Sequence, residues 1–411
     1  MKKFDVFIVG GGAAGMSLAV YLKMNSKNLK VAVAEQLSRV GKKLITTGNG
    51  RCNITNSDER IDRYHSSNIE FFSQILNKYD NKKIEDFFEK TGVKIIYDEE
   101  GRAYPESLQA SSVVDALRFS ATENSVEIFT DLKVLDYKKS GSEFIISTSS
   151  GEYFSKALVI APGLYSGGKK SGSDGSIFEL LKSKGYGAVK VKPAIVQIKT
   201  DNQVTRSLKG IKVLADVSLK SGKTVIRKEY GEVLFCDYGL SGPPVMQISG
   251  ECEKGMTVSL DLMPKNDETE LFKMLKNRKE YLKNRVSFEF FTGLLNKRVG
   301  QSILKSANVK SDLLCGEISD NKLLALSKMI KDMSFSVAGN TGFENSQVTK
   351  GGLSTDFFDR YTLMSKKEDN LYAVGEILDI CGDCGGFNLH WAWSSAMCCA
   401  DSVIKAFGGA K

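Results

Sequence analysis

The stretch "FDVFIVGGGAAG", residues 4–15, decides the fold of this chain. Residues 4–9 are nearly all apolar or β-branched, which predicts a buried strand, and a glycine-rich turn and a helical pattern follow directly. A second apolar strand, residues 30–34, ends at Glu35. Strand, GxGxxG turn, helix, strand and acid, in this order, are typical of the βαβ unit that binds dinucleotides. We therefore predict an α/β fold with a Rossmann-like domain.

The glycine-rich turn also predicts how a dinucleotide binds. Its glycines allow a tight turn and let a pyrophosphate reach the helix N-terminus, where unpaired N–H groups and the helix dipole favour negative charge. Glu35 is expected to accept hydrogen bonds from a ribose 2′-OH. The contacts expected from this βαβ unit are Gly10, Gly12, Ala13, Ala14, Gly15, Glu35 and Gln36.

The fingerprint alone does not separate NAD from FAD, but two further segments favour FAD. The loop "RVGKKLITTGNGRCNITN", residues 39–56, combines glycines with fixed polar side chains just after the acid. Near the C-terminus, a strand over residues 371–374 ends at Gly375-Glu376, where an acid suits the hydroxyls of a ribityl chain. A helix then opens after Gly385-Gly386. Its N-terminus would stabilise the negative charge that a flavin's N1/C2=O edge gains on reduction.

Composition narrows the class of protein. The 411 residues include 57 basic and 49 acidic ones, a net charge of +8, and the lysines are scattered, although residues 265–331 are fairly basic. Nucleic-acid binding normally needs a concentrated patch, so we expect no nucleic-acid partner. No apolar run approaches the roughly 20 residues that span a bilayer, and the N-terminus reads as mature structure, so we expect no membrane association and a cytoplasmic location.

The eight cysteines are expected to be reduced thiols rather than a disulfide framework. Only one CxxC occurs, so we expect no metal site. That motif, Cys381 with Cys384, raises the hypothesis of a dithiol that exchanges electrons with the flavin, because a nearby helix N-terminus lowers a thiol pKa. The alternative is a pair of structural thiols that line a loop. Trp391 and Trp393 are expected in the core or in a pocket wall.

From Val9 to about Ala400 the chain resembles the bacterial FAD-dependent oxidoreductases of the HI0933-like or aminoacetone-oxidase-like group, which includes a bile-acid 3-dehydro-Δ4,6-reductase. The segments that carry the resemblance are "IVGGGAAG", "GKKLITTGNGRCNITN", "GRAYPESLQASSVVDAL", "GEVLFCDYGLSGPPVMQIS", "GFENSQVTKGGLS" and "GEILDICGDCGGFNLHWAWSS". "GNGRCNITN" and "GGFNLHWAWSSA" are more specific to this group than the glycine fingerprint is.

The resemblance implies a FAD domain that is split in sequence, residues 1–190 and 340–411. The insert would hold a β-rich substrate domain, residues 191–262, and a helical subdomain, residues 263–339, and its sequence pattern agrees with this division. The further FAD contacts implied are Lys43, Thr47, Gly48, Gly50, Arg51, Cys52, Asn53, Ala161, Gly163, Gly375, Glu376, Gly386, Phe387, Asn388 and Leu389.

The chain departs from the group's pattern in three places. Pro162-Gly163-Leu164 stands where Thr-Gly-Gly is usual, which puts the local flavin contact in doubt. His390 stands where Gln is common, and the two CxxC cysteines occupy positions that are more often Asp and Thr.

The predicted function is an FAD-dependent reductase, fed by NAD(P)H, of a C=C bond conjugated to a ketone in a steroid-like or bile-acid-like small molecule. With one fingerprint and no separate nicotinamide domain, NAD(P)H would visit the substrate cleft and leave first, which predicts ping-pong kinetics. His390 is the first candidate acid and Tyr238 the second; alternatively, His390 only hydrogen-bonds the flavin or caps the helix. His65, in a polar stretch, is expected at the surface.

The sequence is also compatible with three other functions. The first is an FAD-dependent oxidase of a small amine or aminoketone, and the second is the flavin–dithiol protein that uses Cys381 and Cys384. The least favoured is a redox-sensing flavoprotein that binds nucleic acid, which only the basic helical insert supports. Neither the substrate, the choice of NADH or NADPH, nor the oligomeric state can be read from the sequence.

Overall fold

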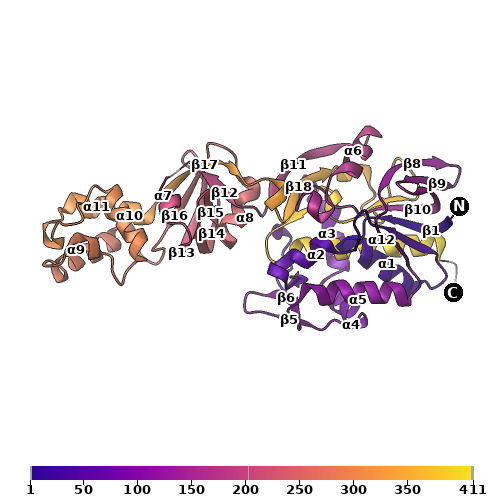
Figure 1. Cartoon of the computed structure of the whole chain (residues 1–411), viewed down its shortest axis with the longest axis horizontal. Coiled ribbons are helices and arrows are strands. Elements are labelled where there is room, and N and C mark those ends of the chain that lie inside the picture. The colour runs from indigo at the N-terminus through magenta and orange to yellow at the C-terminus, as the bar shows by residue number, and fades with distance from the viewer. Residues whose placement is uncertain (1, 202, 409–411) are drawn as a thin grey trace. The chain divides into compact units, whose positions relative to one another are not determined.

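The computed structural model describes residues 2–201 and 203–408. The chain forms two compact units (Figure 1): unit 1 comprises residues 1–194 and 343–411, and unit 2 comprises residues 195–342. Each unit has its own hydrophobic core. The chain therefore leaves unit 1 once, builds unit 2 and returns.

Unit 1 is built on a seven-stranded sheet in the order β7-β2-β1-β10-β9-β8, with β19 paired to the end of β10. The strands are β1 (Lys2–Val9), β2 (Val31–Ala34), β7 (Glu127–Phe129), β8 (Val134–Ser140), β9 (Glu143–Thr148), β10 (Gly151–Ile160) and β19 (Leu371–Ala373). β7, β2, β1, β10 and β19 run parallel. Their carboxyl ends therefore share one edge, where ligands of open α/β sheets bind.

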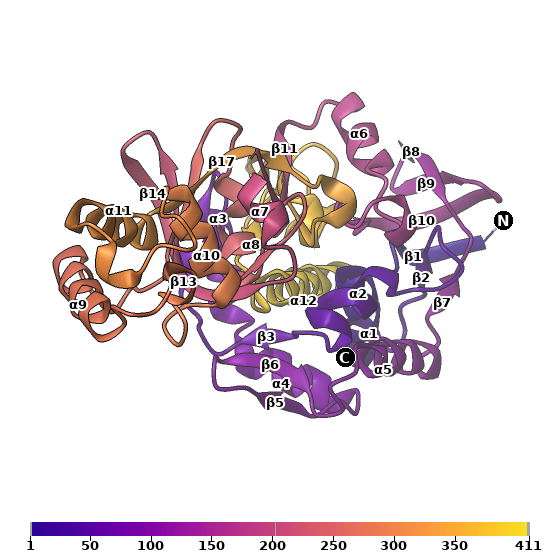
Figure 2. The ribbon, with the colours of Figure 1, turned by 60° about the vertical axis from the view of Figure 1, so that its left-hand side comes forward.

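Three helices pack together beside this sheet. α1 (Ala13–Asn25) contacts α5 (Ala110–Glu123) and α12 (Phe387–Phe407), and Figure 2 shows α12 near α1. Trp391 and Trp393 of α12 are buried, as predicted for core residues. Their indole N–H groups donate to the carbonyl oxygens of Gly375 (3.1 Å) and Ile54 (3.0 Å). The two tryptophans thus attach α12 to the loops that flank it.

Smaller elements complete unit 1. The helices are α2 (Lys42–Thr46), α3 (Ile69–Lys78), α4 (Asn81–Lys90) and α6 (Ser176–Ser183). A small sheet consists of β3 (Thr55–Asn56), β6 (Arg102–Pro105) and β5 (Ile95–Tyr97). Two further pairs of strands are β4 (Tyr64–His65) with β20 (Cys381–Gly382) and β11 (Ala188–Ala194) with β18 (Val348–Leu353). Both pairs join a segment before unit 2 to one after it. They hold the two halves of unit 1 in register.

Unit 2 is a closed barrel, and its helices within residues 268–331 lie together at one end of it (Figure 1). Around the barrel the strands are β12 (Ile198–Thr200), β15 (Gly239–Ser241), β14 (Thr224–Phe235), β13 (Lys212–Ser221), β16 (Thr257–Asp261) and β17 (Met333–Asn340). The helices are α7 (Gln203–Ser207), α8 (Pro243–Ile248), α9 (Glu268–Tyr281), α10 (Lys297–Ser306) and α11 (Asp320–Lys331).

The end of the insert differs from the sequence prediction. The segment expected to be helical, residues 263–339, contains α9 to α11, but its last residues form β17, which closes the barrel between β16 and β12. Phe335 and Val337 are buried, whereas Ser334 and Ser336, which alternate with them, are exposed. This alternation is the period of a strand with one face in a core.

Candidate functional site

The glycine-rich turn lies at the carboxyl edge of the parallel strands. Gly10 has φ +104°, and a Cβ there would lie 2.4 Å from the carbonyl oxygen of Ala161, so no larger residue fits. Gly12 precedes α1 and provides no side-chain cap, and a Cβ on it would meet no atom within 4 Å. The N-terminus of α1 therefore presents its N–H groups to open space, as an anion such as pyrophosphate requires.

Glu35 lies beside this turn at the end of β2. Its carboxylate oxygens accept hydrogen bonds from the backbone N–H groups of Gly11 and Leu37, both at 2.9 Å. Burial raises the pKa of Glu35, while these hydrogen bonds act in the opposite direction. A carboxylate has further lone pairs, so Glu35 retains acceptor capacity for ribose hydroxyls. Gln36 donates instead to the carbonyl oxygen of Gly172 (2.5 Å).

A polar network joins four separate segments near the same edge. Lys43 Nζ lies 2.5 Å from both Glu376 Oε2 and Ser166 Oγ. Ser166 also donates to Glu376, and the backbone N–H of Thr349 donates to Glu376 Oε1 at 2.7 Å. Glu376 is thus neutralised by a lysine. Neither Ser166, in a loop, nor Thr349, in β18, could be predicted from the sequence, because a single hydroxyl residue carries no motif.

The N-terminus of α12 holds an unsatisfied polar atom. Its N-cap, Gly386, has φ +105°, and a Cβ there would lie 2.4 Å from the carbonyl oxygen of Thr55 and 2.8 Å from Asn53 Oδ1. Asn53 Oδ1 is buried and has no hydrogen-bond partner in the described part of the chain. An unpaired acceptor beside an uncapped helix N-terminus suits a ligand edge that offers both an N–H donor and negative charge.

These features fit FAD. The N-terminus of α1 suits the pyrophosphate, Glu35 a ribose, and Asn53 with the N-terminus of α12 the pyrimidine edge of the flavin, which presents an N–H group between two carbonyls. The rest of the predicted contact residues lie in the following segments. They are Ala13, Ala14 and Gly15 in α1, Thr47, Gly48 and Gly50 in the turn after α2, Arg51 and Cys52 in the following loop, Ala161 and Gly163 after β10, Gly375 after β19, and Phe387, Asn388 and Leu389 in α12.

Arg51 and Cys52 make contacts within the protein. Arg51 places its guanidinium 4.7 Å from the ring centroid of Tyr104. Cys52 is fully buried, and burial raises the pKa of its thiol to about 12. Its thiol therefore stays protonated and packs as a small apolar group.

His390 lies inside the core of unit 1. Its Nε2 is 3.1 Å from the carbonyl oxygen of Tyr79, and its Nδ1 is 2.6 Å from Thr55 Oγ1. Burial lowers its pKa to about 4. With both ring nitrogens engaged by protein groups, this geometry favours a structural hydrogen-bonding role over that of an acid. Tyr238 belongs to unit 2, on the turn between β14 and β15, and burial raises its pKa.

The two cysteines of the CxxC motif, one in β20 and one in the loop before α12, form no disulfide. Cys381 is buried in β20, and burial raises the pKa of Cys384. A redox-active dithiol requires the opposite shift, because the thiolate is the reacting form. Among the described residues, no group of three or more His, Cys, Asp or Glu side chains is placed to hold a metal ion.

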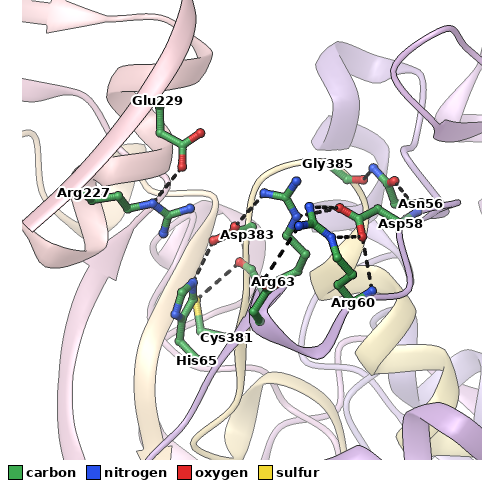
Figure 3. Close-up of polar contacts among 12 residues, drawn as sticks. Asn56, Asp58, Arg60, Arg63, His65, Arg227, Glu229, Cys381, Asp383 and Gly385 are labelled. Atoms are coloured by element: carbon green, nitrogen blue, oxygen red, sulfur yellow. Dashed lines mark hydrogen bonds and ion pairs between the residues drawn. The ribbon is translucent and has the colours of Figure 1, made fainter. Parts of the chain in front are cut away.

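His65 is not a simple surface residue, contrary to the sequence prediction. It lies on β4 with a partly buried side chain, and its Nε2 is 2.7 Å from Asp383 Oδ1 (Figure 3). Neither residue was predicted as part of a site. The polar stretch around His65 predicted an exposed residue, and the contact itself could not be predicted because Asp383 lies more than 300 residues away in sequence.

Comparison with known proteins agrees with the interpretation of unit 1 as a Rossmann-like domain. The family model of the HI0933-like protein Rossmann domain matches residues 4–402. A 3-dehydro-bile acid delta(4,6)-reductase of Clostridium scindens is 32% identical over 397 residues, which cover 94% of this chain and 96% of that protein. Ribosomal RNA dihydrouridine synthases of Haemophilus influenzae and Escherichia coli are 27% and 28% identical and cover 97% and 99% of this chain, and 98% and 99% of their own lengths.

Solved structures share the fold. A flavocytochrome c3 fumarate reductase in its open conformation has a TM-score of 0.52 at 14% identity and covers 98% of this chain and 78% of that one. The 3-ketosteroid delta1-dehydrogenase of Sterolibacterium denitrificans has a TM-score of 0.52 at 12% identity and covers 99% of this chain and 100% of that one. In the described part of the chain, no helix is long and apolar enough to cross a membrane.

Fold and site together define a Rossmann-type flavoprotein of the oxidoreductase class. The chain belongs to the HI0933-like family, which confirms the predicted family and the predicted α/β fold class.

Proposed function

We propose that this protein is an FAD-dependent reductase, fed by NAD(P)H, of a C=C bond conjugated to a carbonyl group. One observation carries the proposal: two kinds of relative, each matched over nearly the whole chain, are named for this one chemical step. A Δ4,6-reductase of a 3-dehydro bile acid saturates bonds conjugated to a 3-oxo group. A dihydrouridine synthase saturates the uracil C5=C6 bond, which is conjugated to the C4 carbonyl.

The reaction balances with one nicotinamide per bond. NAD(P)H gives up a hydride and a proton comes from the protein or from water; the β-carbon of the acceptor gains the hydride, the α-carbon gains the proton, and NAD(P)⁺ leaves. Bound FAD supplies the two-electron carrier between donor and acceptor. With a single dinucleotide fingerprint, donor and acceptor would use the same flavin face in turn, so ping-pong kinetics are expected.

The residues of the site support this chemistry through binding and charge. The uncapped N-terminus of α12 offers positive potential where a reduced flavin would carry negative charge. Glu376, held by Lys43, Ser166 and Thr349, keeps this part of the site fixed. Fixed dipoles of this kind need no rearrangement when the charge develops.

A small-molecule enone is the acceptor we favour, because the bile-acid reductase shares more identity with this chain than the RNA-modifying relatives do. The test is product analysis. Purified protein is incubated with NADH or NADPH and a 3-oxo-Δ4 steroid or a bile-acid enone. A product heavier by two hydrogen atoms supports the proposal, whereas unchanged enone with either nucleotide contradicts this choice of acceptor.

A uracil base in RNA is the second candidate acceptor. Unit 2 carries 23 basic and 17 acidic residues, so it holds +6 of the chain's net charge of +8. A basic insert suits a polyanionic substrate. Incubation with unmodified ribosomal RNA and NAD(P)H, followed by nucleoside analysis, tests this: dihydrouridine would assign the acceptor to RNA, and its absence beside active steroid reduction would exclude it.

Oxidation of an amine or aminoketone and flavin–dithiol exchange through Cys381 and Cys384 remain alternatives within the same class. Each predicts a different electron acceptor, oxygen in the first case and a disulfide in the second. A cytoplasmic location is part of the proposal, since NAD(P)H is available there.

A further inference from the structure

We propose that His65 is the proton donor of the reduction and that Asp383 is the residue that positions it. This inference rests on the proposed function, which requires a proton at the α-carbon of the acceptor. It assigns a role to a pair that neither the sequence motifs nor the comparisons identify.

The pair lies next to the N-terminus of α12 along the chain. β4 and β20 pair antiparallel, with His65 opposite Cys381, and the backbone N–H of Asp383 donates to the carbonyl oxygen of Arg63 at 2.8 Å. Three residues after Asp383 comes Gly386, the N-cap of α12. His65 is therefore held one short loop away from the helix N-terminus that suits the flavin's pyrimidine edge.

Two amide side chains fix that loop. Asn388, in the first turn of α12, accepts from the backbone N–H of Gly382 at 2.8 Å and donates to its carbonyl oxygen at 2.7 Å. Asn56 Nδ2 donates to the carbonyl oxygen of Gly385 at 2.8 Å (Figure 3). The geometry of the pair and that of the helix N-terminus are thus set by the same hydrogen bonds.

Asp383 is arranged to orient an imidazole. Its side chain is only 4% exposed, and its two carboxylate oxygens lie 2.7 Å from His65 Nε2 and 3.5 Å from Arg63 Nη1. Arg63 in turn contacts Asp58 at 2.7 Å, and hydrogen bonds from Arg60 hold the pKa of Asp58 well below its usual range. A buried, charge-balanced carboxylate fixes the proton of the imidazole on Nε2 and stabilises the ring when it carries a second proton.

His65 can reload its proton from solvent. Its side chain is 28% exposed, in contrast to the enclosed ring of His390. In the proposed step the imidazolium of His65 loses a proton from Nδ1, a C–H bond forms at the α-carbon, and the negative charge of the enolate is removed. Water then returns a proton to the ring, and the Asp383 carboxylate stays ionised throughout.

The experiment compares three variants of the FAD-loaded protein, namely His65→Gln, Asp383→Asn and the matched control Asp379→Asn. Asp379 is a second buried carboxylate, on the other side of β20, but it accepts from the backbone N–H (2.9 Å) and the hydroxyl (2.6 Å) of Ser67, not from a histidine. Stopped-flow absorbance follows bleaching of the flavin by NAD(P)H and its recovery with the enone separately. A ¹⁵N spectrum of the imidazoles gives a readout that is independent of activity, since the chain has only two histidines.

We expect bleaching to keep its wild-type rate in all three variants. Recovery with the enone should slow about 100-fold or more in His65→Gln and about tenfold or more in Asp383→Asn, and stay within about twofold of wild type in Asp379→Asn. The Nε2–H signal of His65 should shift in Asp383→Asn and stay unchanged in Asp379→Asn.

Equal recovery rates in wild type and His65→Gln would overturn the inference and leave the reductase intact. If His65→Gln does not retain FAD, Asp383→Asn decides: an unshifted imidazole signal or a wild-type recovery rate overturns the proposal. Failure of the proposed function looks different, because the wild-type flavin would then not recover with an enone at all.

Discussion

Gly386 shows how a single residue can determine whether the site forms. Its φ of +105° disfavours any side chain, and an added Cβ would collide with the carbonyl oxygen of Thr55. We expect Gly386→Ala to lower the free energy of unfolding by about 3 kcal/mol and to abolish FAD retention. Urea unfolding and the flavin absorbance of the purified protein measure the two effects.

Gly50→Ala is the matched control for this substitution. Gly50 also has a positive φ, +82°, but an added Cβ would meet no atom within 4 Å. The substitution is then expected to add only backbone strain, which lowers the free energy of unfolding by about 1 kcal/mol. Equal losses in both variants would show that the contact with Thr55 does not limit the packing of α12.

Burial of His390 predicts a pH dependence of stability. Its pKa falls from the ordinary 6.5 to about 4, so between these values the unfolded chain binds a proton that the folded chain does not. Stability is therefore unaffected by this group above pH 6.5 and falls as pH drops toward 4, by about 3 kcal/mol in total. Urea unfolding between pH 4 and 7 should show a steeper decline for wild type than for His390→Gln. An equal decline of the free energy of unfolding in wild type and His390→Gln would contradict a neutral, buried imidazole at His390.

The raised pKa of Cys384 predicts that the flavin takes electrons alone. Anaerobic dithionite titration should consume two electron equivalents per flavin in wild type and in a Cys384→Ser variant. Four equivalents in wild type and two in the variant would support electron exchange between the flavin and a dithiol of Cys381 and Cys384.

At the scale of elements, the N-terminus of α1 is the most direct part of the site to test. Gly12 leaves open space at the N-cap, so a side chain fits there without a collision. Gly12→Asp places a negative charge where the pyrophosphate is expected, and Gly12→Asn has the same shape without the charge. Equilibrium dialysis should give an FAD dissociation constant at least about tenfold larger for Asp than for Asn. Equal constants would place the pyrophosphate elsewhere.

Elements with a local signal could be predicted from the sequence, and elements made by distant pairing could not. The βαβ unit around residues 4–35 and the helix after Gly386 follow from apolar periodicity and glycine position, and the structure has both. The pair β4–β20 is four residues in all, and each strand exists only because the other lies beside it. The start of β17 could not be predicted because a single residue, Asp332, separates it from α11, so no turn signal marks the boundary.

The same limit applies to the site. Gly10, Gly12, Glu35 and Gly386 could be predicted because backbone geometry demands glycine and a strand end places an acid. Ser166 and Thr349 could not, since their role arises only when the folded chain brings α2, β18 and the segments after β10 and β19 together around Glu376. His65 was assigned to the surface for the same reason.

At the scale of the whole molecule, the two units carry different properties. Unit 1 holds the dinucleotide features and little net charge, whereas unit 2 holds most of the charge excess. The first is expected to set the chemistry and the second the choice of acceptor. If so, differences in the second unit would let relatives named for a bile acid and for RNA act on different acceptors.

The most direct test of the central claim is the anaerobic absorbance of the FAD-loaded protein. A stoichiometric amount of NADH or NADPH is added first, and a 3-oxo-Δ4 steroid or bile-acid enone second. We expect the flavin bands to bleach with the nucleotide and to return with the enone. Bleaching that only air reverses would contradict reduction of the enone, and no bleaching with either nucleotide would contradict NAD(P)H as the donor.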